Sequence, residues 1–138
     1  MTGAALAACA VLTIIATVHF YWATGGTVWK AGAIPSREGV PVLSPSPAIT
    51  VLVGVALLGM AAVVASTAGL LPRFLPIGLL RSASTVLALI FAFRAVGEFR
   101  YVGFFKRVRG SIFAGRDTYL YSPLCLLLAV LIALVALA

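Results

Sequence analysis

Three ionisable side chains in this sequence have the types and spacing needed to move protons. Arg94 and Glu98 lie four residues apart in the segment Phe93–Tyr101, which reads FRAVGEFRY, so on a helix they share one face. His19 is the single histidine, and Glu98 is one of three acids in the 138 residues. A carboxylate beside an imidazole in an apolar pocket can donate and accept protons. The pattern therefore predicts acid–base chemistry with His19 and Glu98 as the catalytic residues.

Other residues near these three are predicted to bind or enclose a substrate. We expect Arg94 to hold an anionic or carbonyl group of a lipid-soluble small molecule, while aromatic side chains form the walls of the pocket. The reaction would then be isomerase-like or cyclase-like. The predicted substrate-binding residues are Arg94, Trp22, Tyr21, Arg100, Tyr101, Asp117 and Tyr119.

Two other functions account for the same residues. In the first, Arg94 and Glu98 neutralise each other with His19 hydrogen-bonded nearby, because buried ions are costly unless they are paired. The cluster would then only pin the helices of a structural or assembly membrane protein. In the second, Glu98 binds a proton or a cation in a small coupled transporter. The sequence leaves all three functions open, so whether the chain is an enzyme is undecided at this level.

Several cofactor-dependent chemistries are disfavoured by the sequence. His19 has no cysteine or acid at metal-ligand spacing, which argues against a zinc site and against haem held by two histidines. The pair Gly25-Gly26 is too short a signal for a phosphate-binding loop. We therefore expect neither a metal nor a cofactor.

The elements that must position these residues are membrane spans. Hydrophobic residues make up 63% of the chain and the mean hydropathy is +1.19. Uncharged apolar stretches of about 18 or more residues are typical of spans, and they satisfy their backbone hydrogen bonds as helices. The sequence predicts an all-α integral membrane protein, a four-helix transmembrane bundle that forms one domain over residues 1–138. The predicted helices are Ala4–Ala23, Ile49–Leu71, Pro76–Phe99 and Ser122–Ala138, the last with Ser122 as N-cap and Pro123 at the first helical position.

Two connections between the predicted helices carry their own patterns. Loop one, Thr24–Ala48, is long and contains four glycines and four prolines, which exclude a helix over most of it. Its many apolar residues predict that it folds back over the end of the bundle. Loop three places an aromatic and apolar face between flanking cations, which predicts an interfacial helical segment between helices three and four. That face consists of Tyr101, Phe104, Phe105, Val108 and Ile112.

Basic residues are unevenly distributed among the loops. Loop one holds two and loop three holds five, which makes seven, whereas loop two holds two. The positive-inside rule therefore predicts a multi-pass protein of the cytoplasmic membrane with loops one and three inside and both termini outside. The net charge of +7 is assigned to topology and to contact with anionic membrane lipids, not to nucleic acid. A hydrophobic small-molecule ligand and a homo-oligomer remain open as further partners.

Three blocks of the sequence resemble a known family. They read HFYWATGG at His19–Gly26, FRAVGEFRYVGFFKRVRG at Phe93–Gly110 and DTYLYSPLCLLL at Asp117–Leu128. These blocks resemble the signature blocks of a small four-span bacterial integral membrane family, the domain of unknown function 3995 family. The resemblance covers nearly the whole chain and implies a four-helix architecture. That family has no assigned chemistry, so the resemblance implies no catalytic role for any residue.

Overall fold

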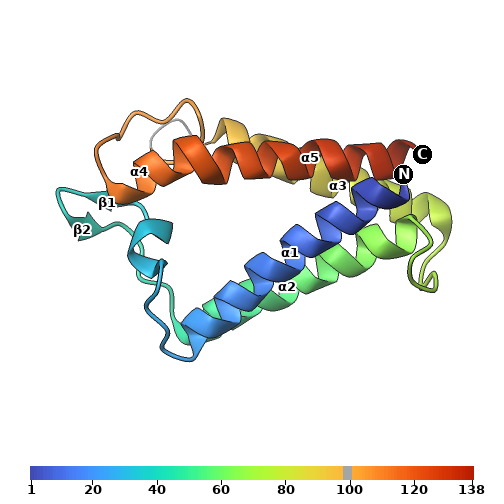
Figure 1. Ribbon diagram of the computed structural model, residues 1–138, viewed down its shortest axis with the longest axis horizontal. Coiled ribbons are helices and arrows are strands. Elements are labelled where there is room, and N and C mark those ends of the chain that lie inside the picture. Colours follow the sequence, from blue (N-terminus) through green and yellow to red (C-terminus); the bar gives the residue numbers. More distant parts are fainter. Residues whose placement is uncertain (98–100) are drawn as a thin grey trace.

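The computed structural model describes residues 1–97 and 101–138 and consists mainly of helices (Figure 1). Four of its helices are long and apolar enough to cross a membrane, which confirms the predicted fold class. The fourth span combines three consecutive elements, α4, a π-helical turn η2 and α5. The elements are α1 (Thr2–Ala23), the 3₁₀ helix η1 (Lys30–Ala33), β1 (Ser36–Arg37), β2 (Val40–Pro41), α2 (Pro47–Thr67), α3 (Ile77–Val96), α4 (Ile112–Arg116), η2 (Asp117–Tyr121) and α5 (Ser122–Leu137).

The spans form two helical hairpins. Helix α1 packs mainly on α2, and α3 packs mainly on α5. The hairpins meet at the end that holds both termini and diverge toward loop one (Figure 1). Near the meeting end, the hydroxyl oxygens of Thr67 on α2 and Ser84 on α3 are hydrogen-bonded at 2.9 Å, and both side chains are buried. The bundle is therefore tied at one end, while loop one and the segments around α4 fill the other.

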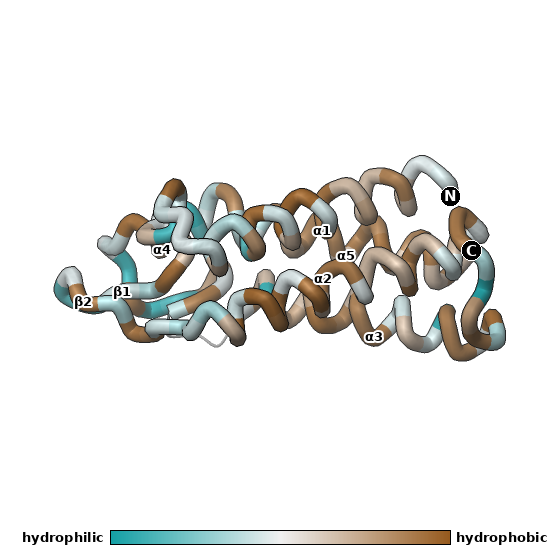
Figure 2. The backbone as a smooth tube through the Cα atoms, turned by 90° about the horizontal axis from the view of Figure 1, so that it is seen from below, coloured by the Kyte–Doolittle hydropathy of each residue, from teal (hydrophilic) through white to brown (hydrophobic). Residues whose placement is uncertain are grey.

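The hydrophobic core explains why the hairpins meet where they do. Along α1, Ala5, Ala8, Leu12 and Ala16 are fully buried at spacings of three and four residues. Three of these four are alanines, which let neighbouring helix backbones approach closely. The outward faces of the spans are also apolar, and hydrophobic residues run along all four of them in Figure 2. Such a surface suits lipid, so the chain is a multi-pass membrane protein.

The fourth span begins earlier than the sequence predicts. Ser111 is its N-cap and accepts a hydrogen bond from the Ala114 amide at 3.0 Å, so the prediction that Ser122 caps the helix was wrong. The helix continues through Pro123 because a π turn, residues 117–121, precedes it. Proline has no N–H and its ring crowds the carbonyl four residues earlier. The wider turn absorbs that conflict, and it places Ser122 against Asp117.

Loop one covers the diverging end of the bundle, as the sequence predicts. It contains the short helix η1 and a two-stranded hairpin, β1 and β2, which pair antiparallel. Glu38 and Gly39 form the hairpin turn with positive φ angles of 53° and 79°. Loop one contacts the fourth span through the indole N–H of Trp29, which donates to the Tyr121 hydroxyl at 2.9 Å.

Loop three does not form the predicted interfacial helix. Residues 101–110 adopt turns and bends, and a helix begins only at Ile112. The cause is backbone geometry, because Gly103 and Gly110 have φ angles of +89° and +107° that a right-handed helix cannot contain. The chain instead folds back onto the end of α3, where the Phe104 amide donates to the Ala95 carbonyl at 2.8 Å.

Candidate functional site

A buried carboxylate, Asp117, lies at the centre of the polar groups of the helical hairpin formed by α3 and the fourth span. Its Oδ1 accepts from Arg94 Nη2 at 3.0 Å and from the Ser122 hydroxyl at 3.2 Å. Its Oδ2 accepts from the Gly103 amide at 2.7 Å and from Lys106 Nζ at 3.0 Å. An ionised carboxylate has about four lone-pair positions, so this one is fully used.

Lys106 is the second member of this cluster and is equally enclosed, since none of its side chain is exposed. Besides Asp117, its ammonium group donates to the Gly103 carbonyl at 3.0 Å and to the Thr118 hydroxyl at 2.6 Å. An ammonium group has three N–H donors, and all three are satisfied. The lysine is therefore held in a closed set of hydrogen bonds.

Two glycines make this arrangement sterically feasible. A Cβ added at Gly103 would collide with the Val96 carbonyl oxygen, and one added at Gly97 would collide with the Val102 carbonyl oxygen. Both residues also have positive φ angles, +86° at Gly97 and +89° at Gly103. Glycine therefore permits the backbone after α3 to cross the end of that helix at contact distance. The crossing delivers the Gly103 amide and Lys106 to Asp117.

We name Asp117, Arg94, Lys106, Ser122 and Gly103 the Asp117 cluster. It joins the end of α3, the segment after it and the π turn of the fourth span. Such a cluster is a strong architectural clamp, because removing one partner leaves an uncompensated buried charge. The hydrogen bonds of Asp117 and Lys106 are saturated, which makes these two groups poorly suited to binding a ligand or moving a proton. Among the described residues, Arg94 Nη1 is buried without a hydrogen-bond partner.

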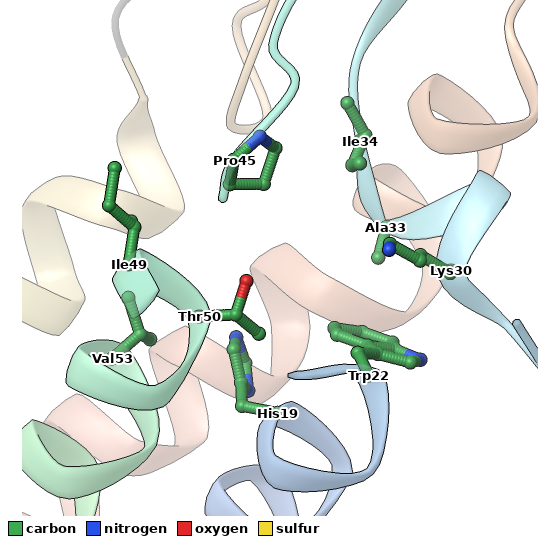
Figure 3. A pocket seen from close by; sticks show the side chains of 9 residues that line it. All are labelled: His19, Trp22, Lys30, Ala33, Ile34, Pro45, Ile49, Thr50 and Val53. Carbon is green, nitrogen blue, oxygen red and sulfur yellow. The ribbon is translucent and has the colours of Figure 1, made fainter. Parts of the chain in front are cut away.

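A separate cavity of about 130 Å³ lies between loop one and the end of the helical hairpin formed by α1 and α2 (Figure 3). Two helices and the loop contribute to its wall, and most of the wall is apolar. The lining residues are His19 and Trp22 from α1, Ile49, Thr50 and Val53 from α2, and Lys30, Ala33, Ile34 and Pro45 from loop one.

His19 presents one nitrogen to this cavity. Its Nδ1 is 2.8 Å from the Ile15 carbonyl, which can only accept, so we assign the proton to Nδ1. In the neutral ring Nε2 is then the acceptor, and none of the described residues hydrogen-bonds to it. Trp22 packs edge-on against the imidazole at 5.1 Å between ring centroids, while its indole N–H donates to the Val28 carbonyl at 2.9 Å. The imidazole is thus oriented on one side and open on the other.

Lys30 supplies the charge of the cavity wall. It is the first residue of η1, and Figure 3 shows its side chain extending toward the cavity. Within the described part of the chain, no group accepts a hydrogen bond from its ammonium nitrogen, and no acid is among the lining residues. The cavity therefore combines a cation and an open imidazole with apolar walls.

Loop one is fastened to the fourth span directly beside this cavity. The Tyr121 hydroxyl accepts from Trp29 Nε1 at 2.9 Å and donates to the Gly32 carbonyl at 2.7 Å. The Arg116 guanidinium lies 3.9 Å from the centroid of the Trp29 ring, a cation–π contact. Trp29 has a positive φ of 68°, which is uncommon for a bulky residue. We call these four residues, Trp29, Gly32, Arg116 and Tyr121, the loop-one latch.

The predicted site residues fall into separate places. Arg94 and Asp117 meet in the Asp117 cluster, whereas His19 and Trp22 line the cavity, and the two sets share no residue. The remaining predicted residues lie in neither set, or outside the described residues. Tyr21 is 44% exposed, Tyr119 is 86% exposed, Tyr101 is partly buried, and Glu98 and Arg100 fall on residues 98–100, which are not described.

Sequence reasoning missed three residues that matter most for these two sites. Lys106 looked equivalent to the neighbouring cations Arg107 and Arg109, and only the backbone crossing at Gly103 selects it. Lys30 carried a usable signal, because it is a charge inside an apolar loop expected to cover the bundle. Thr50 carried none, since a threonine in a span is usually explained by a hydrogen bond within its own helix, as to the Ser46 carbonyl here.

Together, the fold and these sites define a small four-span membrane protein with a buried ion clamp and a loop-covered cavity. The chain belongs to the family described as "Protein of unknown function (DUF3995)", whose model matches residues 2–132. Comparison with curated proteins and with solved structures gives no match. The family assignment agrees with the resemblance of the three sequence blocks.

Proposed function

We propose that this membrane protein binds a small lipid-soluble molecule in the cavity under loop one and exchanges a proton with it through His19. The observation that carries the proposal is the open Nε2 of His19 on an apolar cavity, with Nδ1 held by the Ile15 carbonyl. In Figure 3 the ring rises from α1 toward Thr50 on the opposite wall. An imidazole that is oriented through one ring nitrogen and has its other nitrogen free is suited to general acid–base catalysis.

The class of reaction proposed is one in which a proton is removed at one atom and returned at another, as in an isomerisation or a cyclisation. His19 accepts the proton at Nε2 while Nδ1 keeps its own hydrogen bond, so the ring need not turn. The apolar wall, including Val53 and Ile34, limits water and strengthens electrostatic contacts inside. Glu98, the predicted second catalytic group, lies outside the described residues and stays a prediction.

A structural function is the second candidate, and the Asp117 cluster favours it. All four acceptor positions of Asp117 and all three donors of Lys106 are occupied by the protein itself. A clamp of this kind fixes helices without any ligand. The same saturation argues against cation transport through Asp117, because a transported ion needs vacant carboxylate oxygens. The cluster and the cavity are thus proposed to have different roles.

The experiment that tests the first proposal uses protein in lipid nanodiscs incubated with a lipid extract of its host. Lipid-soluble compounds are compared before and after incubation by mass spectrometry. Wild-type protein should convert at least one compound, and His19→Gln should reduce that rate roughly 10²–10⁴-fold while remaining folded. Equal conversion by wild type and folded His19→Gln would remove His19 from the chemistry.

A matched pair of variants tests the cavity itself. Val53 lines the cavity and is 39% exposed, whereas Val55, two residues further along α2, does not line it and is 54% exposed. Val53→Phe should fill the cavity and abolish both conversion and retention of any co-purified molecule. Val55→Phe adds the same volume toward lipid and should leave both unchanged. Equal effects of the two substitutions would show that the cavity is not the site.

A further inference from the structure

We infer that the ligand of the loop-one cavity is an anion, a small amphiphile whose carboxylate-like group is bound by Lys30. This inference rests on the proposed function, which places a ligand in the cavity, and adds the chemical class of that ligand. The residue that carries it was absent from the sequence-based prediction, which gave the anion-binding role to Arg94. The structure commits Arg94 to Asp117 at 3.0 Å.

The charges around the cavity favour an anionic ligand. Among the described residues that line the cavity, Lys30 is the one with a formal charge. Of the two acids that the structure describes, Asp117 is paired with Arg94 and Lys106, and Glu38 is exposed at the tip of the β1–β2 hairpin. The cation on the cavity wall therefore has no balancing anion among the residues that the structure describes. A partly buried charge is costly without a partner, and a ligand anion supplies that partner.

The other polar groups of the cavity wall are hydrogen-bond acceptors. The Thr50 hydroxyl donates to the Ser46 carbonyl at 3.0 Å, so toward the cavity it offers lone pairs only. His19 Nε2 likewise accepts when the ring is neutral. Lys30 is thus the hydrogen-bond donor of the cavity wall, and an ammonium group is suited to binding a group rich in acceptors, such as a carboxylate. The Thr50 hydroxyl and His19 Nε2 can accept hydrogen bonds from other groups of the ligand, including the proton that the ligand transfers to His19.

The volume of the cavity limits the size of the ligand. A cavity of about 130 Å³ is close to an engineered cavity of about 150 Å³ that holds benzene. The cavity is therefore large enough for a six-membered ring or a short alkyl chain that carries one carboxylate. Apart from Lys30, His19 and Thr50, the cavity wall is mostly apolar, which suits the hydrocarbon part of the ligand. A longer tail would have to leave the cavity toward lipid.

The test uses 4-fluorobenzoate as the anionic probe and 4-fluorobenzamide as its neutral counterpart of similar shape. Binding is followed by ¹⁹F NMR line broadening on protein in nanodiscs of phosphatidylcholine, which has no net charge. Fluorobenzoate should bind roughly 10- to 100-fold more tightly than fluorobenzamide, the range expected for a hydrogen bond to a charged group. The Lys30→Gln variant should lose that preference, whereas Lys30→Arg should keep most of it.

Arg37→Gln is the matched control, because Arg37 is a cation on the same loop that is exposed and does not line the cavity. It should leave the affinity for fluorobenzoate unchanged. Equal binding of the two probes, with Lys30→Gln without effect, would overturn the anion inference and leave the cavity as a site for neutral molecules. If neither probe binds and Val53→Phe changes nothing, the proposed function falls, and this inference falls with it.

A lipid headgroup and a free amphiphile share this anionic chemistry, and the membrane composition separates them. Replacing part of the phosphatidylcholine with anionic phosphatidylglycerol should weaken fluorobenzoate binding if lipid headgroups reach Lys30. Unchanged affinity in those nanodiscs would assign the site to a free small acid. In both cases the preference lost in Lys30→Gln identifies the bound group as an anion.

Discussion

Lys106 Nζ and Asp117 Oδ2 lie 3.0 Å apart, and neither side chain has any exposed surface. They lie eleven positions apart in the sequence, and the chain between them is not a continuous helix, because residues 101–110 adopt turns and bends. Asp117 also pairs with Arg94, so one buried anion contacts two cations. The relationship means that the three charges must be considered together when any of them is changed.

The first prediction concerns the cost of breaking this pair. Asp117→Asn leaves Arg94 and Lys106 without an anion and should lower the free energy of unfolding by roughly 3–5 kcal/mol. Lys106→Met should cost less, because Asp117 keeps Arg94. The double variant should cost less than the sum of the two, as seen in thermal unfolding of detergent-solubilised protein. Arg107→Met, at an exposed neighbouring cation, is the control. Strict additivity would show that Lys106 and Asp117 do not stabilise each other.

The second prediction concerns the backbone crossing that brings Lys106 to Asp117. Gly103→Ala should destabilise the protein by more than about 3 kcal/mol, because its Cβ would meet the Val96 carbonyl. Gly110→Ala has a similar φ of +107° but open space around the new Cβ, so it should cost only about 1–2 kcal/mol. The measurement is the shift in unfolding temperature of each variant. Equal shifts would indicate that φ strain alone, and not the crossing, makes glycine necessary.

The four spans could be predicted from the sequence because they depend on a local property, the length of each predominantly apolar stretch. Their ends were less accurate. Helix two was expected to reach Leu71 but ends at Thr67, two residues before Gly69, whose φ is +75°. Helix three was expected to reach Phe99, and α3 ends at Val96 before Gly97. A left-handed glycine ends a helix, but many glycines within spans do not.

The candidate sites could be predicted only in part, for a physical reason. Residues on one helix, such as His19 and Trp22, are related by helical spacing, and the structure places both on the cavity. Partners from different segments depend on how loops cross, and periodicity does not encode that. Lys30 reaches the cavity through the fold of loop one, and Lys106 reaches Asp117 through the contact of two glycines.

The third prediction concerns topology, for which the charge asymmetry predicts that loops one and three lie in the cytoplasm. Single cysteines are introduced at Ser36 in loop one and at Phe74 in loop two, in a Cys9→Ala, Cys125→Ala background. Neither substitution alters the number of charges. An impermeant maleimide applied to intact cells should label Phe74→Cys, and should label Ser36→Cys only after permeabilisation. The opposite labelling pattern would invert the orientation, and with it the leaflet toward which the cavity opens.

The fourth prediction concerns the loop-one latch. The Tyr121 hydroxyl bonds both Trp29 Nε1 and the Gly32 carbonyl, so Tyr121→Phe removes two hydrogen bonds that hold loop one on the fourth span. At roughly 0.5–1.5 kcal/mol for each bond, loop one should open about 5- to 150-fold more often. Opening exposes Thr50, a buried residue of the cavity wall. The rate at which a thiol reagent modifies Thr50→Cys, without the two native cysteines, should rise by that factor.

Tyr119→Phe is the matched control for the latch, because Tyr119 lies on the same π turn but is 86% exposed. The control should leave the modification rate of Thr50→Cys unchanged. Trp29→Phe removes one hydrogen-bond donor and weakens the contact with Arg116, so it should produce an intermediate rise. If Tyr121→Phe labels no faster than Tyr119→Phe, then loop one is not held by the latch. Access to His19 and Lys30 would in that case be limited by something other than the Tyr121 hydroxyl.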